Sequence, residues 1–321
     1  MSSSPIDLSF IIPVYNVAQY LPPCLNSLLS STSHLKTEII LINDGSTDDS
    51  LAIIQAFIQN HPQQLFQIKS QKHQNAGVAR NQGLSLARGE FVVFVDPDDW
   101  LDSVQLEKAL AFTQKKRADV SLCFAQKIIP QTKQSILLDF PYPFWARPWV
   151  ISFRLGHSFL FRGLIAPWNK IYRTSFLRQN HLSFQSLSSA NDVAFYFQMI
   201  ASAQRVAYYP HAFYYYRAAR AGSSSQALDR NYPNLLLSRT EAITRLKKLP
   251  TQFGYAKYDL LARIIADFLH PLPNFSNDHS RQHYLRLLTE FAHQISQDPD
   301  FSISELHRFS WWTNFLQAIA Q

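Results

Sequence analysis

The chain has 321 residues, of which 46% are hydrophobic and 17% are charged, the composition of a globular protein with a sizeable core. This composition excludes a chain that is disordered over most of its length, and 8 glycines exclude a collagen-like repeat. The two cysteines, Cys24 and Cys123, exclude a disulfide framework and a cysteine-based zinc site, and they predict a reducing compartment.

The net charge of +7 is distributed unevenly. Residues 1–102 carry 5 basic and 10 acidic side chains, whereas residues 103–321 carry 25 basic and 13 acidic ones. The first part concentrates carboxylates, as a cation site would. The second part could face anionic lipid headgroups, nucleic acid or a phosphorylated substrate, or it could be a solubilising surface. The basic residues lack the interleaved aromatic side chains of a nucleic-acid groove, so we expect no nucleic-acid partner.

The N-terminal segment has no basic region followed by an apolar run, so it does not resemble a secretory signal. No stretch of about 18 uncharged apolar residues predicts a membrane-spanning helix. These features predict a cytoplasmic protein, and they are compatible with peripheral contact at the inner face of the cell membrane.

Strand and helix patterns alternate over the first 130 residues. Short β-branched or aromatic runs predict strands over 9–15, 38–44, 65–68 and 90–96. Helical spacing predicts helices near 17–31, 48–60, 76–87 and 103–116. This alternation predicts an α/β fold with a mostly parallel sheet flanked by helices. Ser46 to Asp49 fits a capping box at the start of the second helix.

The pattern changes after this region. Residues 140–216 contain 21 aromatic residues, about twice the density of the whole chain, which could line a sugar site or simply form core. Residues 208–217 read as extended structure, and periodic apolar residues from about 229 onward predict about four helices. We therefore divide the chain into a domain over 1–225, with halves at about 1–130 and 131–225, and a helical region over 226–321.

Three of the predicted strands end in polar residues. These ends are Pro13 to Asn16, Asn43 to Ser46, and Asp96 to Asp99. In a parallel α/β sheet, ligands bind beyond the carboxyl ends of the strands. The last group has three carboxylates within four residues, which repel one another unless a cation lies among them, and oxygen ligands suit Mg²⁺ or Mn²⁺. The alternative is that Asp98 or Asp99 caps the following helix.

The combination of motifs resembles the family 2 glycosyltransferases with the GT-A fold. The resemblance is carried by four segments, each at a strand-to-helix junction: Pro13-Val14-Tyr15-Asn16, Asn43-Asp44-Gly45-Ser46-Thr47-Asp48, Gly77-Val78-Ala79-Arg80-Asn81-Gln82-Gly83-Leu84 and Asp96-Pro97-Asp98-Asp99. It is strong over residues 8–102 and weaker over 165–225. It implies a GT-A-like mostly parallel sheet, an aromatic-rich acceptor region and a C-terminal helical extension.

The resemblance also implies roles for particular residues. Pro13, Tyr15 and Asp44 match positions that hold the nucleoside of a nucleotide-sugar, and Arg80 matches a basic residue near the nucleotide. Asp96, Asp98 and Asp99 match the DxD-type motif of the family. The resemblance implies that Asp96 and Asp98 bind the ribose, and that Asp98 and Asp99 bind a divalent metal, Mn²⁺ or Mg²⁺. The metal would bridge the diphosphate of the donor.

A second block lies further along the chain. Trp168-Asn169-Lys170-Ile171-Tyr172-Arg173 resembles the family's Trp-x-Lys-x-Tyr-Arg segment. About 20 residues later, relatives have Glu-Asp, whose Asp is the catalytic base, whereas this chain has Asn191-Asp192. The resemblance therefore implies Asp192 as the base. The alternative for Asp192 is a helix cap.

Arg217 and the serines after Gly222 resemble the family's Tyr-Arg and serine-rich loop. This loop could close over the diphosphate of the donor and exclude water. The alternative is an exposed connector in which Arg217 lies over aromatic surface.

We therefore expect an inverting, metal-dependent glycosyltransferase, either a hexosyl- or an N-acetylhexosaminyl-transferase. It would move a sugar from a nucleotide-sugar donor, expected to be a UDP-sugar, to a glycan or lipid-linked glycan acceptor of a growing surface polysaccharide. The alternatives are a non-catalytic carbohydrate- or lipid-binding scaffold, which Asn191 would favour, and a sugar nucleotidyltransferase. The second alternative is weakened because no glycine follows the first strand.

Overall fold

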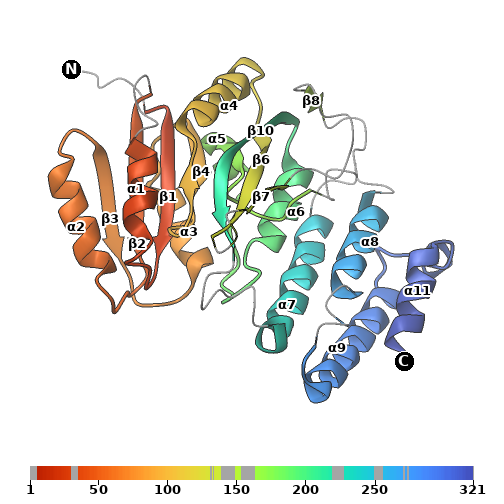
Figure 1. The fold of residues 1–321 in the computed structure, drawn as a ribbon. Helices are drawn as coiled ribbons and strands as arrows, with labels where there is room; N and C mark the ends of the chain where they lie inside the picture. The colour runs from red at the N-terminus through yellow and green to blue at the C-terminus, as the bar shows by residue number, and fades with distance from the viewer. Residues whose placement is uncertain are drawn as a thin grey trace.

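The computed structural model describes residues 6–29, 35–130, 132, 134–138, 149–152, 163–218, 228–248, 256–269, 272 and 275–320. A single sheet runs through the N-terminal two-thirds of the chain, and a block of helices lies at one end of it (Figure 1). The predicted α/β fold with a mostly parallel sheet flanked by helices is confirmed.

The sheet has ten strands. In chain order they are β1 (Leu8–Val14), β2 (Thr37–Asn43), β3 (Leu65–Ser70), β4 (Phe91–Phe94), β5 (Trp100–Leu101), β6 (Val120–Ile129), β7 (Gln134–Leu138), β8 (Trp149–Ser152), β9 (Lys170–Arg173) and β10 (Arg205–Arg217). The main path is β3-β2-β1-β4-β9-β6-β10-β5, while β7 pairs with β6 and β8 pairs with β10. β3, β2, β1 and β4 are parallel to one another, as are β6 and β10, and the other pairings are antiparallel.

Helices connect the strands and form the C-terminal region. In chain order they are α1 (Leu21–Leu29), α2 (Ser50–Asn60), α3 (Ala76–Leu86), α4 (Ser103–Lys115), α5 (Thr174–Gln179), α6 (Val193–Ser202), α7 (Leu228–Lys247), α8 (Ala256–Leu269), α9 (Asp278–Ser296), α10 (Ile303–Leu306) and α11 (Ser310–Ile319). The four strands and four helices predicted over the first 116 residues are all present, with shifts of a few residues at their ends.

The sheet is covered on both faces because its first strands are apolar on both sides. All seven residues of β1 are buried. Phe10 packs in a cluster with side chains of α1, α2 and α4, whereas Ile11 packs in a second cluster with side chains of α3, α5 and α6. Successive side chains of a strand point to opposite faces, so β1 lies between two helical layers and contributes apolar side chains to both.

The second half of the sheet was predicted only in part. The extended segment expected near 208–217 is the end of one long strand, β10, whose register to β6 shifts between Tyr209 and Ala212, around Pro210. Proline lacks the N–H needed for a regular ladder, which accounts for an irregularity at this place. The strands β6 and β9, which join β10 to the parallel half, were not predicted.

The C-terminal helices continue the core of the sheet region. Side chains of α7, α8, α9 and α11 belong to the same apolar cluster as those of α6, and α7 lies beside α6 (Figure 1). The break expected near Pro299 falls between α9 and α10, whereas Pro250, Pro271 and Pro273 lie outside the described residues. Within the described ranges, no helix is long and apolar enough to cross a membrane. Cys24 and Cys123 are buried and unbonded, as expected.

The capping box predicted at Ser46 is wrong. The residue that precedes α2 is Asp49, and its side chain makes no capping hydrogen bond. The hydroxyl of Ser46 instead accepts a hydrogen bond from the backbone N–H of Asn16, at 3.3 Å. Ser46 and Asp48 accept hydrogen bonds from the segment after β1, at Asn16 and Ala18, and so join the ends of β1 and β2. These contacts between distant segments replace the local capping box.

Candidate functional site

A cavity of about 680 Å³ opens beyond the carboxyl ends of the parallel strands. Its lining includes most residues that the sequence analysis singled out, namely Pro13, Tyr15, Asp44, Arg80, Asp96, Asp98 and Asp192. Asp99 and Arg217 are not part of the lining. The cavity continues from these residues to Lys127, Trp168 and Tyr216 in the second half of the sheet.

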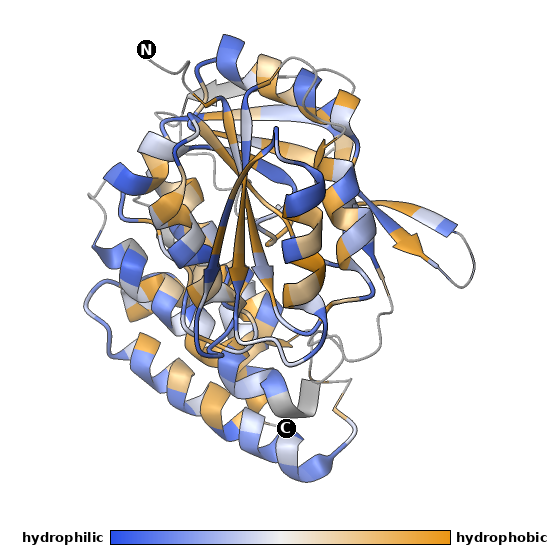
Figure 2. Cartoon of the chain, turned by 90° about the vertical axis from the view of Figure 1, so that its left-hand side faces the viewer, coloured by the Kyte–Doolittle hydropathy of each residue, from blue (hydrophilic) through white to orange (hydrophobic). Residues whose placement is uncertain are grey.

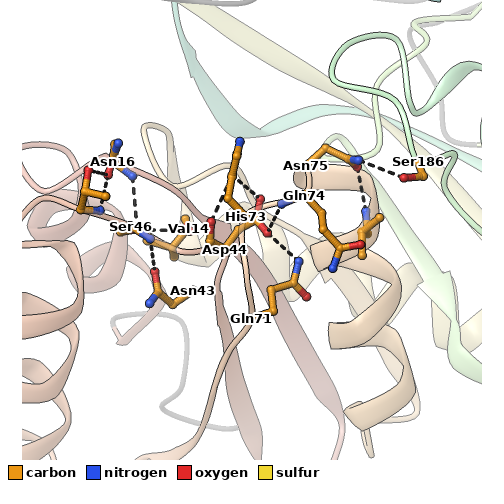
Figure 3. A network of polar contacts seen from close by, with 12 residues as sticks. Val14, Asn16, Asn43, Asp44, Ser46, Gln71, His73, Gln74, Asn75 and Ser186 are labelled. Carbon is orange, nitrogen blue, oxygen red and sulfur yellow. Dashed lines mark hydrogen bonds and ion pairs between the residues drawn. The ribbon is translucent and has the colours of Figure 1, made fainter.

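One end of the cavity is an aromatic and acidic pocket formed by the ends of β1, β2 and β3. The Tyr15 ring stacks on the imidazole of His73, with ring centroids 3.8 Å apart and planes 17° apart. Asp44, which is 2% exposed, accepts hydrogen bonds from Gln71 Nε2 at 2.6 Å and from the backbone N–H of Gln74 at 3.0 Å. Its other oxygen lies 3.0 Å from His73 Nδ1 (Figure 3). The pocket therefore presents a fixed carboxylate beside two flat rings.

The turn after β2 is held by its own backbone conformation. Gly45 has a φ of +74°, and a Cβ at this position would lie 2.9 Å from the backbone nitrogen of His73. A side chain here would be strained and would push away the segment that carries His73. Asn43 accepts a hydrogen bond from the N–H of Ser46 and so closes the turn (Figure 3). This local geometry fixes the position of Asp44.

Arg80 connects the acidic loop after β4 to the opposite wall of the cavity. Its guanidinium, almost completely buried, donates to Asp96 Oδ1 at 2.6 Å and to Asn191 Oδ1 at 3.0 Å. It also lies over the ring of Phe184, 5.4 Å from the centroid. Asn191, at the position where the resemblance implied an acid, thus accepts a hydrogen bond that a carboxylate could also accept.

Helix α3 and the segment 184–191 are joined closely. Asn81 exchanges two hydrogen bonds with the backbone of Phe184, at 2.8 and 2.9 Å. A Cβ on Gly77 would lie 2.3 Å from the carbonyl oxygen of Gln185, so only glycine permits this approach. These contacts bring Asp192 to the same cavity as Asp44, although the two residues are far apart in sequence.

Asp192 precedes α6 and lines the cavity, but its side chain makes no capping hydrogen bond. The alternative interpretation, that Asp192 is a helix cap, is therefore not supported. Burial raises the pKa of the Asp192 carboxyl above its ordinary value, and the nearby Arg80 guanidinium opposes this rise. A partly desolvated carboxylate on a cavity wall can accept a proton from a bound hydroxyl group.

The acidic loop after β4 is divided between the cavity and the core. Asp96 and Asp98 line the cavity, whereas Asp99 is 1% exposed. Asp99 accepts hydrogen bonds from the Tyr214 hydroxyl and from the N–H of Arg217, both at 2.7 Å. Burial raises the pKa of Asp99, and its acidic neighbours raise it further. Neither Asp98 nor Asp99 caps α4, because Asp102 does so through Gln105.

The carboxylates of this loop fit a cation that is shared with a substrate. In the part of the chain that the structure describes, no three His, Cys, Asp or Glu side chains form a cluster that could hold a metal ion. Mg²⁺ and Mn²⁺ do not need such a cluster, because they bind through one or two carboxylates and substrate phosphates. Asp98 and Asp96 line the cavity and could supply such carboxylates, with Asp96 Oδ1 already paired with Arg80, whereas Asp99 is engaged by Tyr214 and Arg217.

Arg217 is hydrogen-bonded to the backbone of the acidic loop after β4. Its Nε donates to the backbone oxygen of Asp98 at 2.9 Å, and its guanidinium lies over the rings of Trp100 and Tyr20. This placement agrees with the alternative of an arginine over aromatic surface. The serine-rich loop after Gly222, and Trp145 of the aromatic region, lie outside the described residues.

The opposite end of the cavity depends on a buried cation. Lys170 donates to the backbone oxygens of Leu164 and Ala166, at 2.9 and 2.6 Å, and to Asn169 Oδ1 at 2.6 Å. Burial lowers the pKa of Lys170 to about 7, while Asp192 opposes this change. These three hydrogen bonds hold the loop that carries Leu164, Ala166 and Trp168 into the cavity wall.

The sequence analysis missed the contributions of His73 and Gln71, and it assigned no role to Lys170. His73 and Gln71 follow β3, the one predicted strand whose polar end was not considered. That signal was available, since all four parallel strands end at the same edge. The role of Lys170 depends on the path of the loop before it, which no sequence spacing indicates.

Both the sequence and the fold are similar to those of known proteins. The sequence model of Glycosyl transferase family 2 matches residues 9–177. The Putative glycosyltransferase EpsH of Bacillus subtilis is 31% identical over 213 residues, which cover 65% of this chain and 60% of that protein. The Uncharacterized glycosyltransferase YibD of Escherichia coli is 30% identical over 250 residues, which cover 72% of this chain and 70% of that protein.

The fold resembles that of TarS from Staphylococcus aureus, a poly(ribitol-phosphate) beta-N-acetylglucosaminyltransferase. The crystal structure of TarS 1–349 in complex with UDP-GlcNAc superposes with a TM-score of 0.71 at 23% sequence identity, over 89% of this chain and 81% of that one. In sequence, the two proteins are 29% identical over 225 residues, which cover 67% of this chain and only 36% of TarS. The chain thus spans only part of several relatives that it matches.

Proposed function

The chain belongs to glycosyl transferase family 2, and on this premise we propose that it transfers a sugar from a UDP-sugar to a hydroxyl group of a glycan, with inversion at the anomeric carbon. The observation that carries the proposal is the single cavity that is lined by Tyr15 and Asp44 at one end, and by Asp192 on the opposite wall. A nucleotide-sugar has the same order of parts: a flat base, a diphosphate and a sugar.

The donor end of the cavity has the chemistry to bind a base and a diphosphate. Asp44 is an acceptor for an N–H group of a base, and the stacked rings of Tyr15 and His73 provide an aromatic surface beside it. Asp98 and Asp96 would hold a divalent cation, Mn²⁺ or Mg²⁺, which when bound would neutralise charge on the diphosphate. UDP-GlcNAc bound to TarS supports a uridine nucleotide as the donor.

The transfer step needs one base. In the proposed reaction, the carboxylate of Asp192 takes the proton of the acceptor hydroxyl as its oxygen forms a bond with the anomeric carbon. The bond from that carbon to the diphosphate breaks on the opposite side, and UDP leaves with the electron pair. Arg80 holds Asp96 and Asn191 in place, and its positive charge favours the ionised form of Asp192.

The test is binding followed by turnover. We expect UDP in the presence of Mn²⁺ to raise the melting temperature of the protein, GDP to have a smaller effect, and a UDP-sugar to release UDP slowly even without an acceptor. Absence of any effect of UDP would contradict the proposal. Binding of UDP-sugars with no release of UDP under any acceptor condition would instead favour a carbohydrate-binding scaffold. The location of the reaction in the cytoplasm stays a prediction.

A further inference from the structure

The hairpin of β6 and β7 extends the cavity wall beyond the body of the molecule. It stands out from the side of the sheet in Figure 2. Lys127 of β6 and Leu138 of β7 line the cavity at the end that lies opposite the nucleotide pocket. The hairpin is therefore placed where an acceptor would leave the cavity.

The strand register determines which hairpin side chains share this face. Lys127 is paired with Ile136, and Ala125 with Leu138. Directly paired residues of an antiparallel ladder point to the same side, so Ile136 lies on the cavity side with Lys127 and Leu138. Leu137 points to the opposite side, as alternation along a strand requires.

The cavity side of the hairpin combines one cation with aliphatic side chains. No carboxylate of the described ranges forms an ion pair with Lys127. Ile136 is 45% exposed, and Leu164 and Ile165 continue the aliphatic lining inside the cavity. An ammonium group next to exposed aliphatic surface complements a ligand in which an anionic group is attached to hydrocarbon.

The same region includes an aromatic wall. Trp168 stacks nearly parallel to Tyr216, with planes 4° apart and centroids 5.6 Å apart, and Tyr216 is the β10 neighbour of Lys127. Flat rings of this kind pack against the faces of sugars. The cavity lining thus combines aromatic rings, aliphatic side chains and an ammonium group, and the register places Lys127 and Ile136 further out along the hairpin than Leu138.

We propose that Lys127 and Ile136 form an acceptor subsite for a phosphate- or diphosphate-linked lipid, in which Lys127 binds the phosphate and Ile136, its partner across the ladder, binds the first part of the hydrocarbon. This inference rests on the proposed function, because it assigns the sugar end of the same acceptor to Asp192. It differs from general attraction to a membrane, since it involves only one face of the hairpin.

The experiment uses calorimetric titration of the full chain with farnesyl diphosphate below its micelle-forming concentration, in buffer with EDTA. Inorganic pyrophosphate and farnesol are titrated as the charged and apolar halves. We expect farnesyl diphosphate to bind at least about tenfold more tightly than either half, because each half makes only one of the two contacts.

Matched variants then test whether farnesyl diphosphate binds to the cavity side of the β6–β7 hairpin. Lys127→Gln is expected to weaken binding of farnesyl diphosphate by about 10-fold or more, as loss of a charge-assisted hydrogen bond does. Ile136→Ser should weaken it by about 3-fold to 10-fold. Leu137→Ser is the control, because Leu137 is equally exposed at 46% but points to the opposite face, and Lys69→Gln on the distant strand β3 controls for charge.

Two results would overturn the inference. One is equal affinity of Lys127→Gln, Ile136→Ser and their controls, and the other is equal weakening by Ile136→Ser and Leu137→Ser, which would indicate a hairpin that inserts into lipid without a defined subsite. Stabilisation by UDP and Mn²⁺ is measured on every variant. If it persists while the lipid results fail, only this inference is wrong, and if it is absent in the unmutated chain, the proposed function is wrong.

Discussion

The two ends of the parallel strands each hold a carboxylate paired with an arginine, but the two pairs differ in what surrounds them: Glu38 is buried and its arginine is exposed, whereas Asp96 is 25% exposed and its arginine is buried. At the amino ends, Glu38 accepts hydrogen bonds from Ser9, Gln67 and Arg88, and both of its oxygens are engaged. At the carboxyl ends, Asp96 pairs with Arg80, and both residues line a cavity.

The two pairs differ in the part of the chain that supplies the arginine. Arg88 comes from the short connection just before β4, so its pair with Glu38 joins the amino ends of the parallel strands. Arg80 lies on α3 and reaches Asn191, more than a hundred residues away, so its pair joins two parts of the chain. The same chemical pair stabilises the sheet at one end and positions a site at the other. We therefore expect substitutions at the two ends to separate stability from activity.

The largest effect is expected at Asp192, on the far wall of the cavity. Asp192→Asn should lower kcat by about 10²-fold to 10⁴-fold, since a general base contributes that much to a proton-transfer step. The affinity for UDP should not change, because Asp192 is not part of the nucleotide pocket. UDP release and calorimetric titration with UDP measure the two quantities.

The matched control for this substitution is Asp102→Asn. Asp102 caps α4 through Gln105, and asparagine caps helices as well as aspartate does, so activity and stability should both persist. If Asp192→Asn kept the activity of the unmutated chain, the base would have to be sought elsewhere in the cavity.

Next in size is the contrast between the two arginines. Arg80→Met removes a buried guanidinium that donates to Asp96 and Asn191, which should cost about 1.5–3 kcal/mol in the free energy of unfolding and should also impair turnover. Arg88→Met removes a guanidinium that is 60% exposed, and Glu38 keeps its hydrogen bonds from Ser9, Gln67 and the backbone N–H at position 88, so the cost should be about 1 kcal/mol or less, with turnover unchanged. Urea unfolding and UDP release, measured on both variants, make the comparison. Equal losses in the free energy of unfolding and in turnover for the two variants would contradict the proposed difference between the two ends of the sheet.

The sequence predicted one of these two ends better than the other. The polar residues after β1, β2 and β4 could be expected to meet, because parallel strands end at the same edge. Glu38 at the amino end was not predicted, since a single acid inside an apolar strand gives no indication of its partners. Its partners Ser9, Gln67 and Arg88 become neighbours only through the strand order β3-β2-β1-β4.

The acceptor end of the cavity was even less predictable. Strands β6, β9 and β10 join the sheet through antiparallel and parallel pairings between segments that are up to about 100 residues apart. Asp192 was expected from family resemblance alone, and Lys127 gave no signal. Periodicity reports which face of an element is buried, whereas the partner of that face is a property of the whole fold.

A smaller effect is expected from pH. Because burial raises the pKa of Asp192 and only its ionised form accepts a proton, kcat should fall as the pH is lowered through that raised pKa. The midpoint should lie above the ordinary aspartate value of about 4. In Arg80→Met the midpoint should move further up, because Arg80 favours the carboxylate. A profile of kcat against pH measures both, and a midpoint at or below the ordinary value would contradict the assignment of Asp192.

The smallest effect on activity is expected at Glu38, where the change should be confined to stability. Glu38→Gln exchanges one oxygen for an amide that faces donors, and it should cost about 1.5–3 kcal/mol in the free energy of unfolding while kcat stays the same. Burial alone would raise the pKa of Glu38, but its hydrogen bonds from Ser9, Arg88 and Gln67 lower it overall. A lowered pKa contributes stability above the unfolded value of about 4.3, and this contribution is lost as the pH falls through the folded value. Urea unfolding at several pH values should therefore show the unmutated chain and Glu38→Gln converging in acid. A loss of kcat at unchanged stability would mean that the amino end of the sheet takes part in the reaction, and the contrast between the two ends would then be wrong.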